Sequence, residues 1–297
     1  MIIEPLYEAD FLQCSYGFRP KRSTHQAVKE VHKQVNYRKW IVDIDLKSYF
    51  DTIPHGQLME CVRKRVTDRK ILHLIRKWLK VGILEEGKVR YVVSGSPQGG
   101  VLSPLLSNIY LHEFDRQWKE QYGKLVRYAD DMVILCRTQE AAKQALQRAA
   151  AIIEKLGLEM NQEKTRICHV REGFDFLGFT YREGYSERLE REVRVKYPRK
   201  KTMKSIRQKI KEVIKSFPLG TELKEVIAAI NRKVRGWANY FRIGNAYAAA
   251  ISLNNYVCMQ LRIFWRRRKQ RKDISGTRKW SNAYFYEKGV CYVPNLL

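Results

Sequence analysis

The stretch Arg127-Tyr128-Ala129-Asp130-Asp131-Met132-Val133-Ile134-Leu135 places two adjacent carboxylates between apolar runs. Leu125-Val126 precedes it, so the pattern predicts two strands joined by a tight turn, with Asp130 and Asp131 at the tip of a β-hairpin. Neighbouring carboxylates repel each other unless a cation neutralises them. The pair therefore indicates a metal site, although an Asp-Asp dipeptide also arises by chance in ordinary acidic turns.

A second acidic motif lies upstream, in a strand predicted over residues 40–46. Asp43 and Asp45 are two positions apart and are expected on one face of that strand, where Asp is otherwise disfavoured. If this strand neighbours the hairpin, Asp45, Asp130 and Asp131 converge at one edge of a small sheet. Such a donor set suits two hard divalent cations about 3.5–4 Å apart, which can activate a 3′-hydroxyl and stabilise a leaving pyrophosphate.

The composition points to a polyanionic partner. The chain carries 57 Lys and Arg against 31 Asp and Glu, a net charge of +26, which favours nucleic acid first and a membrane surface second. No apolar run is long enough to span a bilayer, and no secretory signal opens the chain. The six cysteines include no Cys-x-x-Cys pair, which argues against a zinc finger and suits a protein of the bacterial cytoplasm or of an organelle.

Two loops are candidates for anion binding. Ser94-Gly95-Ser96-Pro97-Gln98-Gly99-Gly100 leads into a helix predicted from Ser103 and would present backbone N–H groups to a phosphate, or would simply link a hairpin to that helix. Residues 15–23 form a loop with three cations that either hold phosphates or are solvated.

The character of the chain changes near residue 185. Residues 188–204 are densely basic and are interpreted as a linker or arm, and helices are predicted at 203–216, 222–241 and 247–268. The last helix ends in cations interleaved with Phe264 and Trp265. This mixture favours contact with nucleic acid over a solvated helix end.

The ordered motifs resemble those of a reverse transcriptase. They are Tyr16-Gly17-Phe18-Arg19-Pro20, Asp43-Ile44-Asp45, Phe50-Asp51, Pro97-Gln98-Gly99-Gly100, Ser103-Pro104-Leu105-Leu106-Ser107-Asn108-Ile109-Tyr110-Leu111, Tyr128-Ala129-Asp130-Asp131, Asn161-Gln162-Glu163-Lys164-Thr165 and Phe176-Leu177-Gly178-Phe179. Farther along, Arg235-Gly236-Trp237-Ala238-Asn239-Tyr240-Phe241 resembles the maturase-specific region, or domain X, of group II intron-encoded proteins. The resemblance implies an α+β fold. It would comprise a right-hand polymerase palm with partial fingers over residues 1–185, then a basic linker and an all-α thumb, the maturase domain, over 186–297.

The resemblance also implies roles for individual residues. Asp45, Asp130 and Asp131 would be the catalytic ligands of two Mg²⁺ ions, or of Mn²⁺, and the Leu46 carbonyl would add a ligand. Lys164 would lie near the triphosphate as a proton donor to pyrophosphate. The remaining roles are a ring under the sugar (Tyr49 or Phe50, left open by the spacing), a nucleotide pocket (Gln98, Gly99), and primer or RNA contacts (Arg19, Phe176, Leu177, Gly178, Arg235, Trp237, Arg266, Arg267 and Arg268).

The function implied is that of an RNA-directed DNA polymerase, a nucleotidyltransferase of the group II intron type that also aids splicing. Its partners would be intron RNA, an RNA template, a DNA primer and dNTP. One alternative is a maturase that stabilises folded intron RNA while its polymerase site is idle. Another is a reverse transcriptase of a defence or diversity-generating element, against which the Trp237 region argues.

The ends of the chain depart from the family pattern. Family members carry a longer N-terminal fingers region, so we expect that segment to be truncated, absent, or encoded separately and supplied in trans. Unaided polymerase activity is therefore in question. The C-terminal end shows no His/Cys nuclease signature, and we expect no DNA cleavage by this chain.

Overall fold

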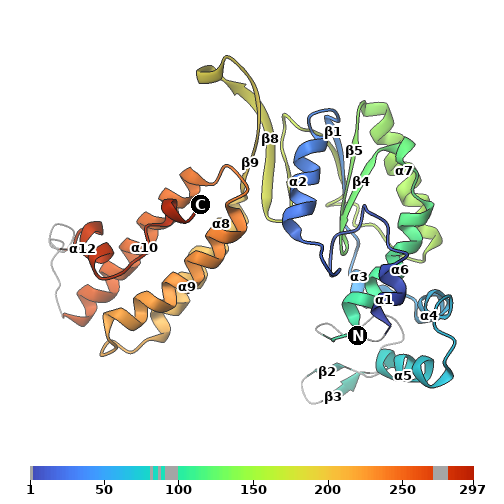
Figure 1. The fold of residues 1–297 in the computed structure, drawn as a ribbon, viewed down its shortest axis with the longest axis horizontal. Helices are drawn as coiled ribbons and strands as arrows, with labels where there is room; N and C mark the ends of the chain where they lie inside the picture. Colours follow the sequence, from blue (N-terminus) through green and yellow to red (C-terminus); the bar gives the residue numbers. More distant parts are fainter. Residues whose placement is uncertain (1–2, 81–82, 86–87, 91–99, 270–279) are drawn as a thin grey trace. The chain divides into compact units, whose positions relative to one another are not determined.

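The computed structural model describes residues 3–80, 83–85, 88–90, 100–269 and 280–297 (Figure 1). The chain forms two compact units, Met1–Leu177 and Gly178–Leu297. Gln98 and Gly99, which were expected in the nucleotide pocket, lie outside the described residues. None of the described helices is both long enough and apolar enough to cross a membrane.

A four-stranded antiparallel sheet organises the first unit. Its order is β4 (Lys124–Tyr128), β5 (Asp131–Cys136), β1 (Trp40–Ile44) and β6 (Arg166–His169). Successive side chains of a strand point to opposite faces. Val42, Ile44 and Ile134 accordingly join the main apolar cluster, while the intervening Ile41 and Val133 are buried on the other face.

Helices cover this sheet. The main cluster also contains the apolar faces of α4 (His55–Arg63), α6 (Ser103–Gln117) and α7 (Gln139–Lys155), and α2 (Thr24–Gln34) lies against β4 (Figure 1). Ser23 begins α2 with a capping box, in which its side chain accepts from Gln26 N–H while the Gln26 side chain accepts from Ser23 N–H. The remaining elements of this unit are α1 (Glu4–Glu8), α3 (Tyr49–Thr52), α5 (Arg69–Lys80), β2 (Ile83–Glu85), β3 (Lys88–Arg90), η1 (Glu120–Tyr122) and β7 (Phe174–Phe176).

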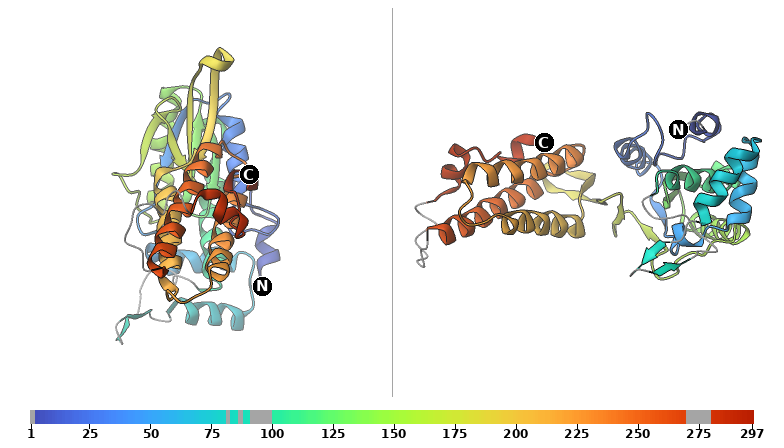
Figure 2. Two further views of the ribbon diagram at one scale, coloured as in Figure 1. Left: turned by 90° about the vertical axis from the view of Figure 1, so that its left-hand side faces the viewer. Right: turned by 90° about the horizontal axis from the view of Figure 1, so that it is seen from below.

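The second unit begins with a long hairpin and continues as helices. β8 (Phe179–Ser186) pairs with β9 (Arg191–Pro198) from Phe179↔Pro198 to Ser186↔Arg191, across the turn η2 (Glu187–Leu189). Helices α8 (Lys200–Ser216), α9 (Leu223–Phe241) and α10 (Tyr247–Arg268) run side by side, as Figures 1 and 2 show. Their shared core includes Ile210, Ile230 and Leu253. α12 (Asn282–Glu287) and η3 (Val293–Leu296) complete this unit.

This second unit corrects two expectations. We expected a domain boundary between residues 185 and 186, but that position lies inside the β8–β9 hairpin, and the units divide after Leu177. The expected basic linker at 188–204 was also wrong. These residues instead form β9 and the start of α8. In β9, Val193, Val195 and Tyr197 occupy alternate positions, a strand pattern that the dense charge obscured.

A close approach inside the second unit yields a test of packing. A Cβ atom added at Gly244 would lie 2.7 Å from the Lys196 carbonyl oxygen and 2.8 Å from the Phe179 ring. We expect Gly244→Ala to destabilise the protein by about 1–3 kcal/mol, as overpacked cores do. The matched control is Gly236→Ala in α9, where an added Cβ meets nothing within 4 Å; it should stabilise the helix by up to about 1 kcal/mol. Urea denaturation measures both, and equal effects would contradict the packing argument.

Candidate active site

The β4–β5 hairpin forms as the sequence of residues 125–135 predicts. Tyr128 pairs with Asp131, so Ala129 and Asp130 make the two-residue turn between the strands. Ala129 adopts a φ of +54°, a left-handed conformation that residues other than glycine seldom take outside tight turns. The turn leaves Asp130 half-buried and Asp131 exposed at the start of β5. We refer to Tyr128-Ala129-Asp130-Asp131, which contains two of the acids expected to be catalytic, as the catalytic turn.

The sheet brings Asp45 to the catalytic turn. β1 runs antiparallel to β5, and their ladder ends with Ile44 opposite Met132, so Asp45 and Asp131 each lie one residue beyond that last pair. Burial raises the pKa of Asp130, and the negative charge of Asp45 raises it further. Asp45, Asp130 and Asp131 therefore lie at the same edge of the sheet, where the charges of Asp45 and Asp130 repel each other.

Asp43 adds to this excess of negative charge. Burial raises its pKa to about 6, and Asp131, Asp175 and Asp45 push the pKa in the same direction. Arg166 opposes the shift, with its Nε 3.8 Å from an Asp43 carboxylate oxygen. Asp43 and its acidic neighbours still repel one another despite the Arg166 contact, so this edge is electrostatically suited to a cation.

The donor chemistry fits hard divalent metals, although the described residues do not form a complete cage. Among the residues that the structure describes, no three His, Cys, Asp or Glu side chains are grouped closely enough to hold a metal alone. Mg²⁺ is commonly bound by one or two carboxylates together with substrate phosphates and water. Oxygen donors on a sheet edge agree with that mode of binding.

A turn after α7 holds Asp45 from its backbone side. The Asn161 N–H donates to the Asp45 carbonyl oxygen at 2.8 Å, and the Asp45 N–H donates to the Thr165 hydroxyl at 3.3 Å. Within this turn, Lys164 extends its Nζ to 3.3 Å from an Asp45 carboxylate oxygen. Both side chains are well exposed, so this ion pair contributes little stability. The adjacent Leu46 is buried and forms a bridge with Met160.

Burial distinguishes the two aromatic residues after Asp45. Tyr49 is 2% exposed, and its hydroxyl donates to the Ser107 carbonyl oxygen at 2.8 Å, so this ring belongs to the core. Phe50 packs edge-on against Tyr49 with ring centroids 5.4 Å apart, and remains partly exposed. Of the two residues that the spacing left open, Phe50 is therefore the more accessible.

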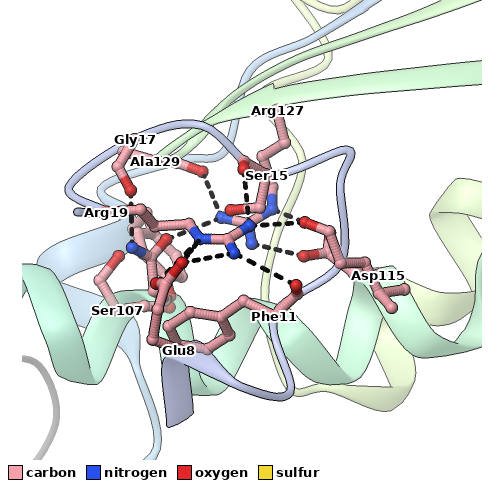
Figure 3. Close-up of polar contacts among 12 residues, drawn as sticks. Glu8, Phe11, Ser15, Gly17, Arg19, Ser107, Asp115, Arg127 and Ala129 are labelled. Atoms are coloured by element: carbon pink, nitrogen blue, oxygen red, sulfur yellow. Dashed lines mark hydrogen bonds and ion pairs between the residues drawn. The ribbon is translucent and has the colours of Figure 1, made fainter. Parts of the chain in front are cut away.

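A buried arginine supports the catalytic turn, and sequence reasoning missed it. Arg127 and Asp115 are both inaccessible to solvent; the Arg127 guanidinium donates to the two Asp115 carboxylate oxygens at 2.9 and 2.5 Å (Figure 3). The same guanidinium donates to the Ala129 carbonyl oxygen at 3.0 Å and to the Asn108 side-chain oxygen at 3.1 Å. One buried side chain thus connects α6 to the backbone of the catalytic turn.

Asn108 extends this support to the loop of residues 15–23. Its amide donates to the Gly17 carbonyl oxygen at 2.7 Å. Gly17 lies so close to the catalytic turn that an added Cβ would be 2.4 Å from the Ala129 nitrogen. The only sequence signal for this network was an arginine inside a predicted buried strand, a position that usually excludes an unpaired charge.

The structure gives Arg19 a structural position. The residue is 8% exposed, and its guanidinium donates to Glu8 at 2.7 Å and to the carbonyl oxygens of Phe11, Leu12 and Ser15 (Figure 3). These bonds occupy the guanidinium inside the protein. They give Arg19 a structural role, and the expected nucleic-acid contact through Arg19 stays a prediction.

Several expected primer and RNA contacts are buried as well. Phe176 is buried, and Trp237, at 5% exposure, packs against Phe241 with ring centroids 5.2 Å apart, so neither ring is free to stack on a base. Leu177 and Gly178 are half-buried and both have positive φ, and the Gly178 carbonyl oxygen accepts from Arg199 N–H at 3.0 Å.

The expected arginines of the second unit differ in exposure. Arg235 and Arg267 are exposed, Arg266 is half-buried, and Arg268 donates to the Thr221 carbonyl oxygen while stacking over Trp265. The expected linker extended to residue 204, inside α8, so the basic surface of this helix was not predicted. The exposed lysines of that helix are Lys200, Lys201, Lys204, Lys209, Lys211 and Lys215.

Comparison with known proteins identifies the class to which this fold and site belong. Residues 2–181 match the family described as reverse transcriptase (RNA-dependent DNA polymerase), and residues 203–285 match the group II intron, maturase-specific domain. The first match covers more than half of the chain. The chain therefore belongs to the reverse transcriptase family, and its helical unit is of the maturase type.

Individual relatives agree with this assignment. Over 60% of its own length, the chain is 38% identical to Protein YkfC of Escherichia coli. Over 97% of its own length, it is 26% identical to the group II intron-encoded protein LtrA of Lactococcus lactis. These matches cover 57% and 64% of the relatives, so the chain spans less than two thirds of either. The solved structure of telomerase from Candida albicans, in complex with a telomeric RNA fragment, also resembles this chain. The match covers 93% of this chain and 52% of the telomerase chain. Its TM-score is 0.50 and its identity 14%, which supports the polymerase fold alone.

The buried ion pair leads to a stability prediction. Arg127→Met leaves Asp115 buried without a partner and should destabilise the protein by about 3–5 kcal/mol. The double variant Arg127→Met/Asp115→Leu removes both charges and should recover most of that loss. Chemical denaturation of the three proteins measures the difference. If the double variant is as unstable as the single one, the unpaired charge is not the cause.

Proposed function

We propose that this protein is an RNA-directed DNA polymerase of the group II intron type, acting by nucleotidyl transfer on a DNA primer annealed to an RNA template. The observation that carries the proposal is the convergence of Asp45, Asp130 and Asp131 on one sheet edge, in a chain of the reverse transcriptase family. The idle-site alternative has no comparable support, because all three carboxylates are present and adjacent.

The residues at this sheet edge would have separate roles in the reaction. Asp45, Asp130 and Asp131 would hold two Mg²⁺ ions, or Mn²⁺, with the Leu46 carbonyl as an additional ligand. Such metals activate the 3′-hydroxyl and stabilise the leaving pyrophosphate. Lys164, an exposed ammonium next to Asp45, would deliver a proton to the leaving pyrophosphate. The Asn161 and Thr165 contacts to the Asp45 backbone would keep that carboxylate in position.

Phe50 is the better-supported residue for selecting the sugar. An aromatic ring beneath the sugar of the incoming nucleotide excludes a 2′-hydroxyl by contact, which requires an accessible ring. Phe50 is partly exposed, whereas Tyr49 is buried and hydrogen-bonded through its hydroxyl. We therefore assign discrimination of dNTP against ribonucleotide to Phe50.

The helical unit would bind intron RNA and assist its splicing. The exposed lysines of α8, with Arg235 and Arg267, offer a cationic surface of the kind that holds phosphates. Trp237 acts as a core residue, so recognition would rest on the shape and phosphates of folded RNA rather than on stacking by that ring. A protein with this role acts where intron RNA is made, in the bacterial cytoplasm or in an organelle.

The polymerase proposal predicts a separable loss of activity. Asp130→Ala/Asp131→Ala and Asp45→Ala should each abolish Mg²⁺-dependent primer extension on an RNA template, because each removes oxygen ligands. Binding of structured intron RNA should persist with an unchanged salt slope, since those contacts lie in the helical unit. Gel extension and filter binding measure the two properties.

The control is Glu140→Gln, an exposed acid in the first turn of α7 and outside the proposed ligand set. It should extend primers as the natural protein does. No extension by the natural protein, combined with tight salt-sensitive binding of intron RNA, would reject the polymerase and favour the RNA-binding maturase. Extension that persists in the Asp130→Ala/Asp131→Ala protein would reject the site.

The assignment of Phe50 predicts altered sugar selectivity. Phe50→Ala should raise ribonucleotide incorporation relative to dNTP by on the order of a hundredfold, since one lost contact of 1–3 kcal/mol changes discrimination by tenfold to about two-hundredfold. Tyr49→Phe, which removes only the buried hydroxyl, should leave selectivity unchanged. Competition assays with matched dNTP and ribonucleotide measure the ratio, and unchanged selectivity in Phe50→Ala would contradict the assignment to Phe50.

A further inference from the structure

Phe18 is an exposed aromatic residue held in an unfavourable conformation beside the catalytic turn. Its φ is +51°, and its side chain is 50% exposed. Its ring centroid lies 6.2 Å from that of Tyr128, with the planes tilted by 46°. A bulky residue rarely adopts positive φ, and such strain persists only where the surroundings impose it. Because Phe18 is half exposed, burial of its ring offsets little of the backbone strain energy. A contribution to folding therefore does not explain why an aromatic residue occupies this position.

The surroundings fix the backbone on both sides of Phe18. On one side, Gly17 is pressed against the Ala129 backbone and accepts from Asn108. On the other, the Arg19 guanidinium is bound to Glu8 and to nearby carbonyl oxygens, including that of Ser15 at 2.9 Å. The loop therefore presents the Phe18 ring from a rigid support, next to the same turn that carries Asp130.

The sheet sets the order of groups along this edge. Ser15 forms a parallel bridge with Arg127, so the loop adds to the outer side of β4, beyond which the order is β5, β1 and β6. Along the edge this gives Phe18 and Tyr128, then the paired acids of the catalytic turn, then Asp45, and finally Lys164. The aromatic pair and the lysine thus lie on opposite sides of the carboxylates.

This order implies which nucleotide meets the aromatic pair. In nucleotidyl transfer the attacking and leaving oxygens lie on opposite sides of the phosphorus, roughly in line. If Lys164 serves the leaving pyrophosphate, the nucleotide that carries the attacking 3′-hydroxyl lies on the far side of the carboxylates. That is the side occupied by Phe18 and Tyr128.

We propose that Phe18, supported by Tyr128, contacts the 3′-terminal nucleotide of the primer and positions it over the catalytic turn. This inference rests on the proposed polymerase function. It makes Phe18 a primer-binding residue, and it explains why an aromatic side chain occupies a position at which glycine would be less strained.

Three substitutions separate a ligand contact from a structural role. Phe18→Gly relieves the backbone strain and removes the ring, so thermal stability should not fall, while the Kd for primer–template should rise on the order of tenfold, the effect of losing one aromatic–base contact. Phe18→Tyr should restore tight binding. Tyr37→Ala, at a 68% exposed ring elsewhere in the same unit, should change neither property. Fluorescence anisotropy with labelled primer–template in Mg²⁺ gives Kd. Unchanged affinity in Phe18→Gly would overturn the proposal.

Crosslinking identifies the strand. Phe18 is replaced by p-benzoylphenylalanine, with Tyr37 replaced in the same way as the control, in proteins that retain all three carboxylates and in parallel in the Asp130→Ala background. Irradiation should join position 18 to the last nucleotides of the primer in both backgrounds. Crosslinks confined to the template, or no more crosslinking than at position 37, would overturn the inference. Primer crosslinks without any primer extension would keep the inference and reject the polymerase activity instead.

Discussion

The buried pair of Arg127 and Asp115 is the interaction on which the rest of the first unit depends. Moving an arginine and an aspartate out of water is expensive, and their mutual attraction offsets this only with good geometry and further hydrogen bonds. Both conditions hold, because the guanidinium makes two bonds to Asp115 and additional bonds to Asn108 and Ala129. The carboxylates of the catalytic turn therefore sit on a backbone that a buried charge holds in place.

The same pair constrains the assembly of several elements at once. Arg127 belongs to β4, Asp115 and Asn108 belong to α6, and the neighbouring loop bonds to the Arg127 backbone through Cys14 and Tyr16. A slip of β4 by one residue would turn Arg127 to the other face of the sheet and leave Asp115 unpaired. The register of β4, the position of α6 and the path of the loop are thus coupled. This coupling also fixes the positions of the acids at the sheet edge.

Local pattern was sufficient to predict the hairpin, the acidic strand and the three long helices, because periodicity and turn residues report on neighbours in sequence. It did not reveal burial. Arg19, Phe176 and Trp237 were expected at a surface and lie in the interior, since a motif identifies a residue without saying which of its atoms meet solvent. Arg127 was overlooked for the converse reason, because its partners are 12 and 19 residues away, on a helix. The β8–β9 hairpin was mistaken for a linker because its charges masked alternating apolar positions.

The distribution of arginine and lysine explains why net charge alone was an incomplete guide. Arg19 and Arg127 are used inside the first unit, where a planar guanidinium can satisfy several fixed acceptors at once. The lysines of α8 remain exposed, and an ammonium on a flexible stem suits phosphates whose positions vary. Part of the +26 charge thus supports the acidic sheet edge from within. The exposed remainder, which includes the lysines of α8, is the part that nucleic acid could contact.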